Sequence, residues 1–465
     1  MRHRFPPVAA ALLGLAAARA PALRAQQFLV HGTTTSQFVQ LRPIQFDPTA
    51  NFDTGAFVAL PATYAAPFTQ DVELSAWGLG IDGLRAYALV RGRAALGSGL
   101  VWPESDEHFQ TLYAYLELER THYLLRAGRQ QRASGLGWYA FDGLTASWRP
   151  LAAVRIEGYG GRGLARASLD APNASAITSL DPLQPDQGTV LLGASLWAAP
   201  SARSSFSAIY QRELLANQSG LVSERAAFDG RLGLGSHLVL AASADADVAR
   251  QQWGKARVSA TVLLGGASVV LEAFRYRPTL DLSTIWGVFS PESHDGYSAT
   301  LILAAARDVS LTGAFTYRRW QPLSIGSPFL VDVGNDQKEA TAGVQVRQGA
   351  WTFDGDYHLE LGFGGDQSAG DLHAAWSPGG GWRAGVSTSA FQQTDLFRVS
   401  GGTVYGLGAD FGTALDRRVA LKVDVTRYFQ RRQTGATGVD WNQTRASVTF
   451  DWTVGADADR VGSYR

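Results

Sequence analysis

The feature that most limits the fold of this chain is an apolar–polar alternation with a period of two, clearest in residues 109–119. Apolar positions on one side alternate with polar positions on the other: Leu112, Ala114, Leu116 and Leu118 against Tyr113, Tyr115, Glu117 and Glu119. Successive side chains of a β-strand point to opposite faces, so this segment predicts a strand with one apolar and one polar face. The chain turns near Thr121 and alternates again on the way back, which predicts an antiparallel hairpin.

The same alternation recurs from Gln27 to Val454. It gives about 22 candidate strands of roughly ten residues, with about 18 to 22 as the range. Tight turns, such as those near Pro150, Gly235 and Gly349, alternate with longer loops, such as residues 162–188 and 278–296. A barrel with both termini on one side of a membrane needs this arrangement. The sequence therefore predicts an all-β fold, a transmembrane antiparallel up-and-down β-barrel.

A soluble β-sandwich is the competing fold, because its strands also alternate. Its core would need many bulky inward residues, whereas the apolar faces here are rich in Ala, Val and Leu. The export signal described next also favours the barrel.

Three segments are expected along the chain. Residues 1–25 have the charged start, short apolar core and small-residue end of a secretory signal peptide. Residues 26–454 form the barrel, and residues 455–465 form a short C-terminal periplasmic tail. We expect the exported protein in the outer membrane of a Gram-negative bacterium, in contact with outer-membrane lipid and the barrel assembly machinery. The chain does not end on the aromatic residue that many such barrels present to that machinery.

Composition excludes several classes of function. None of the 465 residues is cysteine, which excludes disulfides, lipid attachment at a cysteine and covalent c-type haem at a CxxCH motif. The 41 basic residues balance the 41 acidic ones, so nothing indicates nucleic acid as a partner. Histidines lack metal-ligand spacing, and no catalytic motif joins a strand to a helix. We therefore expect no metal, no cofactor and no enzymatic activity.

The cost of charge in lipid assigns the two faces of the strands. An arginine facing lipid at the bilayer centre costs about 2–4 kcal/mol, so the charged faces should point into the lumen. The residues expected to line the lumen are Asp71, Glu73, Arg85, Arg91, Arg93, Tyr113, Tyr115, Glu117, Glu119, Arg126, Arg155, Glu157, Asp245, Asp247, Lys255, Arg257, Asp354, Asp356 and Glu360. In the hairpin around an expected loop at residues 249–254, Asp247 should lie near Lys255, and Asp245 near Arg257.

Tryptophans beside the tight turns form a second predicted group. An amphipathic indole ring anchors at a membrane surface, so these residues are expected to form one aromatic girdle. They are Trp77, Trp148, Trp197, Trp351, Trp376 and Trp382.

Residues 109–161 also carry a family resemblance. A strand, the triplet beginning at Gly128 (GRQ), a loop, the quartet beginning at Phe141 (FDGL) and a second strand follow in that order. The order resembles two related kinds of outer-membrane barrel, the barrel component of porin–cytochrome electron conduits and the alginate-export type of porin. The resemblance implies a superfamily of outer-membrane barrels.

Two charged residues flank the expected loop at residues 131–141. We expect Arg129, or alternatively Arg126, to pair with Asp142 and to hold this loop folded over the lumen. Turn chemistry at Asp142 and Gly143 is the competing explanation for the acidic residue.

Two hypotheses for function remain open. The first is a porin-like channel, a wide water-filled or partner-filled pore for small polar solutes, with the loops at residues 162–188 and 278–296 as its expected constriction. The second, implied by the resemblance, is an insulating sheath around a multihaem cytochrome that moves electrons across the outer membrane. The haem would then belong to the partner, because this chain has no cysteine.

Overall fold

The computed structural model describes residues 27–41, 44–46, 57–59, 61–96, 109–165, 188–216, 220–277, 293–321, 335–362, 366–393, 402–432 and 442–455. No helix long and apolar enough to cross a membrane occurs in these segments. Their strands are β1 (Gln27–Leu41), β2 (Ile44–Phe46), β3 (Phe57–Ala59), β4 (Thr63–Ala65), β5 (Pro67–Trp77), β6 (Leu84–Ala95), β7 (Phe109–Glu119), β8 (Tyr123–Ser134), β9 (Gly137–Leu151), β10 (Val154–Ala165), β11 (Thr189–Ser201), β12 (Ser204–Leu215), β13 (Leu221–Leu234), β14 (Leu238–Asp247), β15 (Gln252–Leu264), β16 (Ala267–Tyr276), β17 (His294–Ala306), β18 (Val309–Trp320), β19 (Asp336–Gln348), β20 (Trp351–Gly362), β21 (Gln367–Gly379), β22 (Trp382–Gln393), β23 (Gly402–Ala414), β24 (Val419–Arg432) and β25 (Asn442–Gly455).

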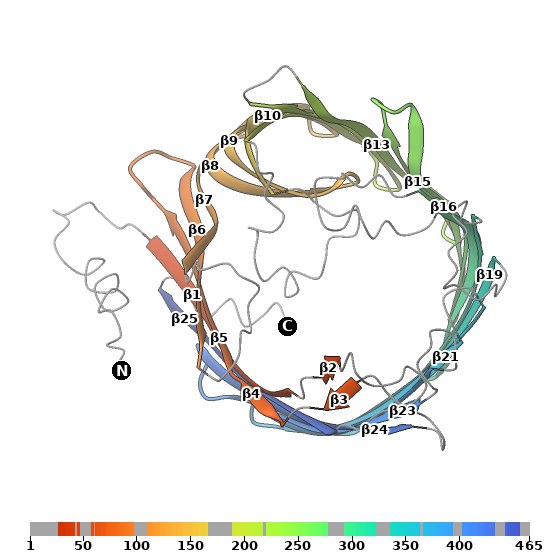
Figure 1. The fold of residues 1–465 in the computed structure, drawn as a ribbon. Helices are drawn as coiled ribbons and strands as arrows, with labels where there is room; N and C mark the ends of the chain where they lie inside the picture. The colour runs from red at the N-terminus through yellow and green to blue at the C-terminus, as the bar shows by residue number, and fades with distance from the viewer. Residues whose placement is uncertain are drawn as a thin grey trace, which may run out of the picture.

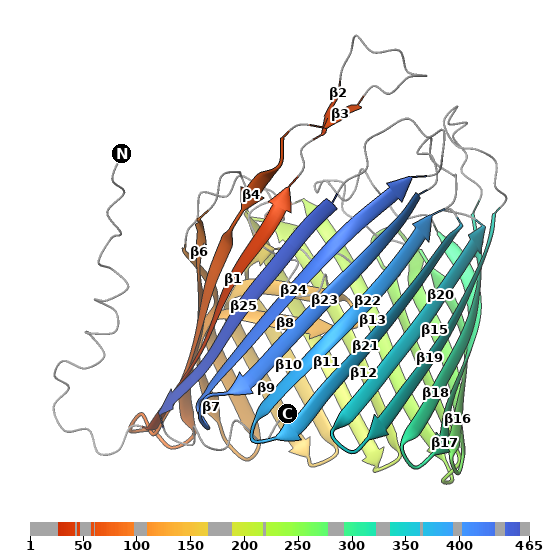
Figure 2. The same ribbon diagram turned by 90° about the horizontal axis from the view of Figure 1, so that it is seen from below.

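The described strands β1 and β5 to β25 close into one 22-stranded antiparallel barrel. Figure 1 is a view down the axis of the barrel, and Figure 2 shows the barrel wall from the side. Strand β1 closes the ring because Val30 lies opposite Val454 of β25 on one side and Leu74 of β5 on the other. Strand β4 continues the β5 edge against β1, and β2 pairs with β3 as a separate ribbon beyond the rim (Figure 2). The predicted fold class is confirmed.

Tight connections gather at one end of the barrel, the lower end in Figure 2, where β1 begins and β25 ends. Between β15 and β16 only Gly265 and Gly266 intervene, and Gly265 has φ 64°. Two-residue hairpin turns need such a left-handed backbone, which glycine adopts without strain. The turn predicted near Pro150 lies slightly later, at Ala152 and Ala153, because Pro150 still belongs to β9.

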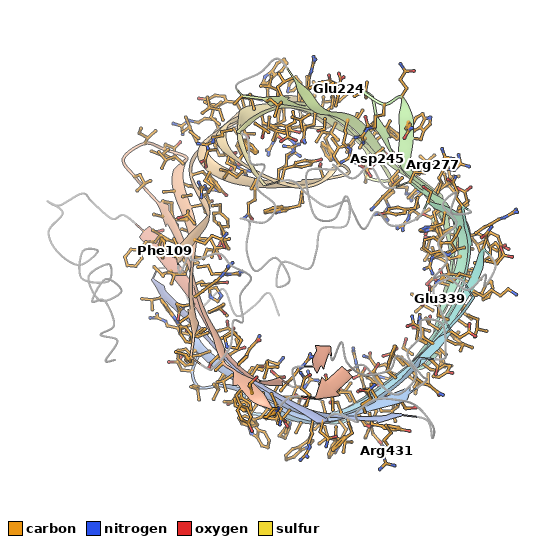
Figure 3. All side chains as sticks on the ribbon, in the orientation of Figure 1. Phe109, Glu224, Asp245, Arg277, Glu339 and Arg431 are labelled. Carbon is orange, nitrogen blue, oxygen red and sulfur yellow. The ribbon has the colours of Figure 1, made fainter. Side chains whose placement is uncertain are left out.

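The two faces of the wall differ in chemistry. Large apolar side chains such as Leu271, Leu301 and Phe315 are about half exposed on the outer face. Alternate positions turn inward, and in Figure 3 Asp245 lies inside the ring whereas Arg431 lies outside it. An apolar outer face and a charged inner face are what a barrel in lipid requires.

One predicted loop is a continuation of two strands. The sequence predicts a loop at residues 131–141, but β8 runs to Ser134 and β9 begins at Gly137, so that only Gly135 and Leu136 form the turn. In Figure 1 this hairpin forms a second layer inside the arc of β10 to β13.

Several predicted segments lie outside the described residues. These are the signal peptide at residues 1–25, residues 456–465 of the tail, and most of the loops at residues 162–188 and 278–296.

Candidate functional site

The inner face of the barrel is the first part of the candidate site. Asp71 lies opposite Thr33 of β1 and opposite Arg91 of β6. Residues directly opposite each other share a face, so the inner face can be followed from strand to strand around the barrel. All the residues that the sequence placed in the lumen, from Asp71 on β5 to Glu360 on β20, fall on this face by register.

Opposite charges on neighbouring strands meet across the inner wall. Arg91 Nε lies 2.7 Å from Asp71 Oδ1, and Arg126 Nε lies 2.6 Å from Glu117 Oε2. On the far side of the ring, Arg318 Nη2 lies 2.7 Å from Glu339 Oε2. Pairs of this kind support the strand register and give the lumen both signs of charge.

The predicted register, with Asp247 opposite Lys255 and Asp245 opposite Arg257, is wrong. Ser243 lies opposite Arg257, and Asp247 lies opposite Gln252. The register differs because the chain turns over Val248 to Gln251, where Gln251 has φ 56°, and because the pairing shifts between Ala244 and Ala246. Sequence spacing alone does not reveal such a bulge.

The girdle prediction is wrong for two of its six tryptophans. Trp197 lies opposite Ser207 on the inner face, and Trp77 lies opposite Arg85 and donates from Nε1 to Gln27 Oε1 at 2.5 Å. The prediction rested on closeness to a turn, whereas alternation along the strand determines whether a side chain points to lipid or to the lumen. The other four lie on the outer face by register: Trp148, Trp351, Trp376 and Trp382.

The inward-folded hairpin of β8 and β9 is the second part of the site. Pairing between β7 and β8 ends at Ala114 and Arg129, and beyond this point β8 leaves the wall. Two side chains of β8 then donate to backbone carbonyls of β7 beyond the end of this pairing. Arg129 Nη1 donates to Thr111 O at 3.1 Å, and Gln131 Nε2 donates to Leu112 O at 3.0 Å.

A row of glycines lies where the hairpin bends. Gly143 of β9 lies opposite Gly128 of β8 on one side and Gly161 of β10 on the other. Gly128 has φ 128°, and a Cβ added there would lie 2.9 Å from Tyr115 Cα. Glycines in register allow a sheet to bend sharply, so the GRQ and FDGL segments supply the bend.

The bent hairpin packs on the inner wall through an apolar cluster. Its buried members are Leu136, Tyr139, Phe141, Tyr159, Leu191, Ile209 and Ala227, from β9 to β13 and the hairpin turn. The rings of Phe141 and Tyr159 lie 5.7 Å apart, and Tyr159 donates its hydroxyl to Gln211 Oε1 at 2.8 Å. This is the cluster of buried apolar side chains in the described barrel, and it fastens the hairpin to the wall.

Arg132 of β8 adds polar contacts between the hairpin and the wall. Its guanidinium lies 4.3 Å from the centre of the Tyr159 ring and forms an ion pair with Glu157. Its Nη2 also donates to Ser195 Oγ at 3.1 Å. One side chain of the hairpin therefore contacts both β10 and β11.

Arg225 of β13 holds the tip of the hairpin. Its Nη1 donates to Leu136 O at 3.0 Å and to the Tyr139 hydroxyl at 3.1 Å, and its Nη2 lies 2.8 Å from Asp245 Oδ2. The side chains of Arg225 and Asp245 are only 9% and 3% exposed. Asp245 Oδ1 also accepts from Lys255 N at 2.6 Å. No pattern in the sequence indicates Arg225, whose partners come together only because the hairpin bends.

Arg129 and Asp142, the predicted pair, lie opposite each other in the hairpin. Arg129 Nε is 2.9 Å from Asp142 Oδ1, and Nη2 is 3.1 Å from Oδ2, so the contact is bidentate. Arg126, the alternative partner, pairs with Glu117. Asp142 and Gly143 are strand residues, not a turn.

Removing this pair should change the stability of the folded barrel only slightly. The two side chains are 33% and 42% exposed, and exposed pairs contribute about 0.2–1 kcal/mol. Asp142→Asn should therefore shift the free energy of unfolding by about 1 kcal/mol or less, measured by urea titration in lipid vesicles. A loss of several kcal/mol would contradict this expectation and show that the pair is a main contact holding the hairpin in place.

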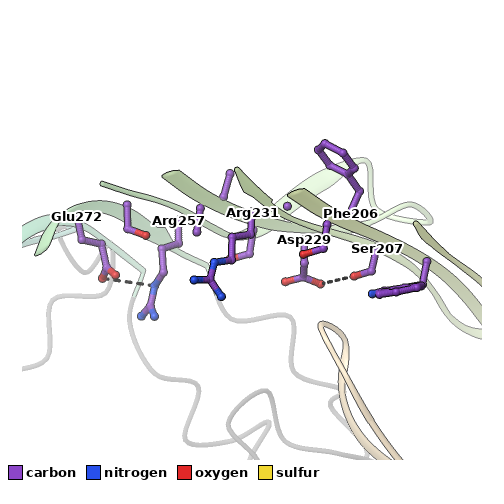
Figure 4. Close-up of a pocket in the computed structure, with 13 residues that line it drawn as sticks. Phe206, Ser207, Asp229, Arg231, Arg257 and Glu272 are labelled. Atoms are coloured by element: carbon purple, nitrogen blue, oxygen red, sulfur yellow. Dashed lines mark hydrogen bonds and ion pairs between the residues drawn. The ribbon is translucent and has the colours of Figure 1, made fainter. Parts of the chain in front are cut away.

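The inner wall is hollowed on the tight-turn side of the hairpin. A depression of about 400 Å³ is lined by charged, hydroxyl and aromatic side chains of β11 to β16, among them Trp197, Ser207, Asp229, Arg231, Arg257 and Glu272. Figure 4 shows the charged groups on one side of the sheet and Phe206 on the other. Asp229 Oδ2 would lie 3.0 Å from a Cβ added at Gly135, so the hairpin tip borders the depression.

Histidines of the inner wall lie among carboxylates. His373 Nε2 lies 2.9 Å from Asp410 Oδ1, and His358 lies between Glu339 and Glu360. Within the segments given above, no group of three or more His, Cys, Asp or Glu side chains is placed to hold a metal ion.

Known proteins give only a likeness of fold. No family model and no curated protein matches the sequence. Among solved structures, OccAB4 of Acinetobacter baumannii is 12% identical, with a TM-score of 0.41 over 92% of this chain and 98% of that chain. OpdQ of Pseudomonas aeruginosa is 8% identical, with a TM-score of 0.42 over 93% and 98%. The translocation pore of the P pilus usher PapC is 11% identical, with a TM-score of 0.46 over 91% and 99%.

These likenesses concern the fold alone. They give no support to the resemblance to porin–cytochrome conduits, which stays a prediction.

Proposed function

We propose that this protein is an outer-membrane channel that passes small polar solutes through a lumen narrowed on one side by the β8–β9 hairpin. The observation that carries the proposal is a closed 22-stranded barrel with an apolar outside and a charged inside, in which a fastened hairpin lines part of the lumen. Barrels of 16 to 18 strands already leave an aqueous channel, and larger ones need something to narrow them.

The charges of the inner wall support passage of polar solutes. Arg91 with Asp71 and Arg257 with Glu272 place both signs of charge on the inner wall, the second pair inside the hollow beside the hairpin. A solute that carries hydroxyl or charged groups can exchange its hydration for such groups, whereas an apolar solute gains nothing from them. In this proposal the hairpin limits the width of the lumen, and the charged side chains of the wall make the lumen polar.

The register of the hairpin gives a direct test. Gln130 and Phe141 lie opposite each other, so replacing residues 131–140 by Asn-Gly joins them through a two-residue turn and removes the inward tip. The shortened protein should conduct more than the wild type in planar lipid bilayers, because the lumen loses its inner layer.

A second hairpin supplies the matched control. Replacing residues 248–251 by Asn-Gly joins Asp247 to Gln252, which are also strand partners. This hairpin belongs to the wall, so its shortening should leave the conductance as it is. Equal conductance of the wild type and the 131–140 variant would contradict the role of the hairpin. A wild-type protein that passes almost no current and copurifies with haem would instead favour the cytochrome sheath.

A further inference from the structure

The outer face of β16 to β19 carries a row of alternating charges near the long-loop rim. Arg275, Asp295, Arg319 and Asp336 lie opposite one another in that order across the four strands. They share the outer face with Leu271, Tyr297, Phe315 and Val344, because each is an even number of residues away on its own strand. The row is therefore on the side that meets lipid.

The next outward row toward the middle of the membrane is aromatic and basic. Tyr297 and Tyr317 stack with ring centres 5.0 Å apart, and Lys338 lies opposite Tyr317. The row after that is apolar and consists of Leu271, Ala299, Phe315 and Ala340. Charge thus gives way to tyrosine rings and then to apolar side chains within a few residues.

The strand length places the charged row at a membrane surface. Ten residues separate Val309 at the tight-turn end of β18 from Arg319. At about 3.3 Å per residue and a tilt of about 40°, this distance is roughly 25 Å along the membrane normal, the height of the apolar band of such barrels. Arg319 therefore lies at headgroup level.

Two cations of this surface have no carboxylate partner among the residues that the structure describes. Arg275 Nε pairs with Asp295 Oδ1 at 2.7 Å, and Asp336 Oδ1 accepts the Tyr317 hydroxyl at 2.5 Å. Arg319 and Lys338 are exposed and form no ion pair with any other residue in the described part of the chain. They lie on neighbouring strands, diagonal to each other, since Arg319 is opposite Asp336 and Tyr317 is opposite Lys338.

At the opposite rim, the outward strand positions of the same four strands carry no charge, and Arg307 lies beyond them in the turn between β17 and β18. Outward positions there are apolar: Val269, Leu303, Leu311 and Val346. Cations at the outward strand positions of only one rim fit a membrane whose two leaflets differ in charge, because a guanidinium or ammonium group gains most beside an anionic headgroup.

We propose that Arg319 and Lys338, beside the Tyr297–Tyr317 stack, bind the phosphate of an anionic lipid in the leaflet at the long-loop end. The phosphate accepts from both cations, and the acyl chains lie on the apolar rows below. Under the outer-membrane location proposed above, the lipid is the phosphorylated glycolipid of the outer leaflet. The contact does not depend on whether the barrel conducts.

Lipid binding by the delipidated protein in detergent tests this site. The probe is bisphosphorylated lipid A, its dephosphorylated form is the comparison, and retained lipid is measured by native mass spectrometry. The wild type should retain the phosphorylated lipid in preference to the dephosphorylated one. Arg319→Gln with Lys338→Gln should weaken binding about tenfold, because it removes two charged hydrogen-bond donors.

Two exposed arginines at the other rim supply the control. Arg203 and Arg307 lie in tight turns, so Arg203→Gln with Arg307→Gln changes the same net charge and should retain lipid as the wild type does. Equal retention by both double variants, or equal retention of the two lipids by the wild type, would overturn the proposal. So would displacement of the lipid by an equal concentration of inorganic phosphate, which would indicate a site for free phosphate.

Discussion

Arg225→Met is expected to detach the β8–β9 hairpin from the inner wall. The change removes the donor to Leu136 O and to the Tyr139 hydroxyl and leaves Asp245, only 3% exposed, without its cation. Removing one member of a buried ion pair costs about 3–5 kcal/mol, because the other charge stays buried and unpaired. The detached state should therefore become about 10² to 10³ times more populated.

Thiol labelling measures this detachment directly. The chain has no cysteine, so Leu136→Cys gives a single reactive group at a turn residue that is 0% exposed while the hairpin is docked. A charged thiol reagent should label it slowly with Arg225 present and about 10² to 10³ times faster with Arg225→Met. Adding Asp245→Asn to Arg225→Met should restore part of the protection, because it removes the unpaired charge.

An arginine elsewhere on the inner face serves as the control. Arg91 pairs with Asp71 at 2.7 Å, and no contact joins it to the hairpin among the described residues. Arg91→Met should therefore leave the labelling of residue 136 nearly unchanged. Equal acceleration by Arg91→Met and Arg225→Met would mean that the barrel as a whole has loosened, and the anchoring role of Arg225 would be wrong.

The barrel itself was predictable because its signals are local. Alternation along residues such as Leu112 to Glu119 specifies the strands, and the cost of charge in lipid specifies which face looks inward. Tight turns, as at Gly265, need particular residues at particular positions, so they also appear in the sequence.

The inward hairpin was not predictable in this way. Its strands keep pairing from Gln130 and Phe141 to Ser134 and Gly137, but both faces become buried or polar, so the alternation no longer separates lipid from water. The glycine row Gly128–Gly143–Gly161 was a usable signal, yet the three residues become neighbours only once the strand register is known. The partners of Arg225 come from two separate segments, the hairpin and β14, and no spacing in the sequence relates them.

Predictions of where a side chain lies were wrong at the positions where they rested on a rule other than the strand period. Closeness to a turn predicts a place in the aromatic girdle for Trp77 and Trp197, but both lie inward. Counting outward from the centre of the expected loop predicts Asp247 opposite Lys255, but a bulge shifts the register. Both errors concern positions, and the 22-stranded barrel does not depend on them.

Leu301→Arg tests the face assignment at the middle of the membrane. Leu301 lies on the outer face of β17, 44% exposed, midway between Asp295 near one rim and Arg307 in the tight turn at the other. An arginine facing lipid at this depth costs about 2–4 kcal/mol, because the guanidinium loses its hydration. Thr300→Arg, one residue earlier, places the same group on the inner face, where water and the wall charges surround it, so we expect a change of about 0.5 kcal/mol or less.

Urea titration of the two variants in lipid vesicles measures this difference, with the folded fraction followed by the mobility of unheated protein in gels. The free energy of unfolding should fall for Leu301→Arg and stay near the wild-type value for Thr300→Arg. Equal losses would show that both faces meet the same solvent, which a closed barrel in lipid does not allow. A larger loss for Thr300→Arg would place the lumen on the other face of β17, and the inner wall, the hairpin contacts and the lipid-facing cations would all be assigned to the wrong sides.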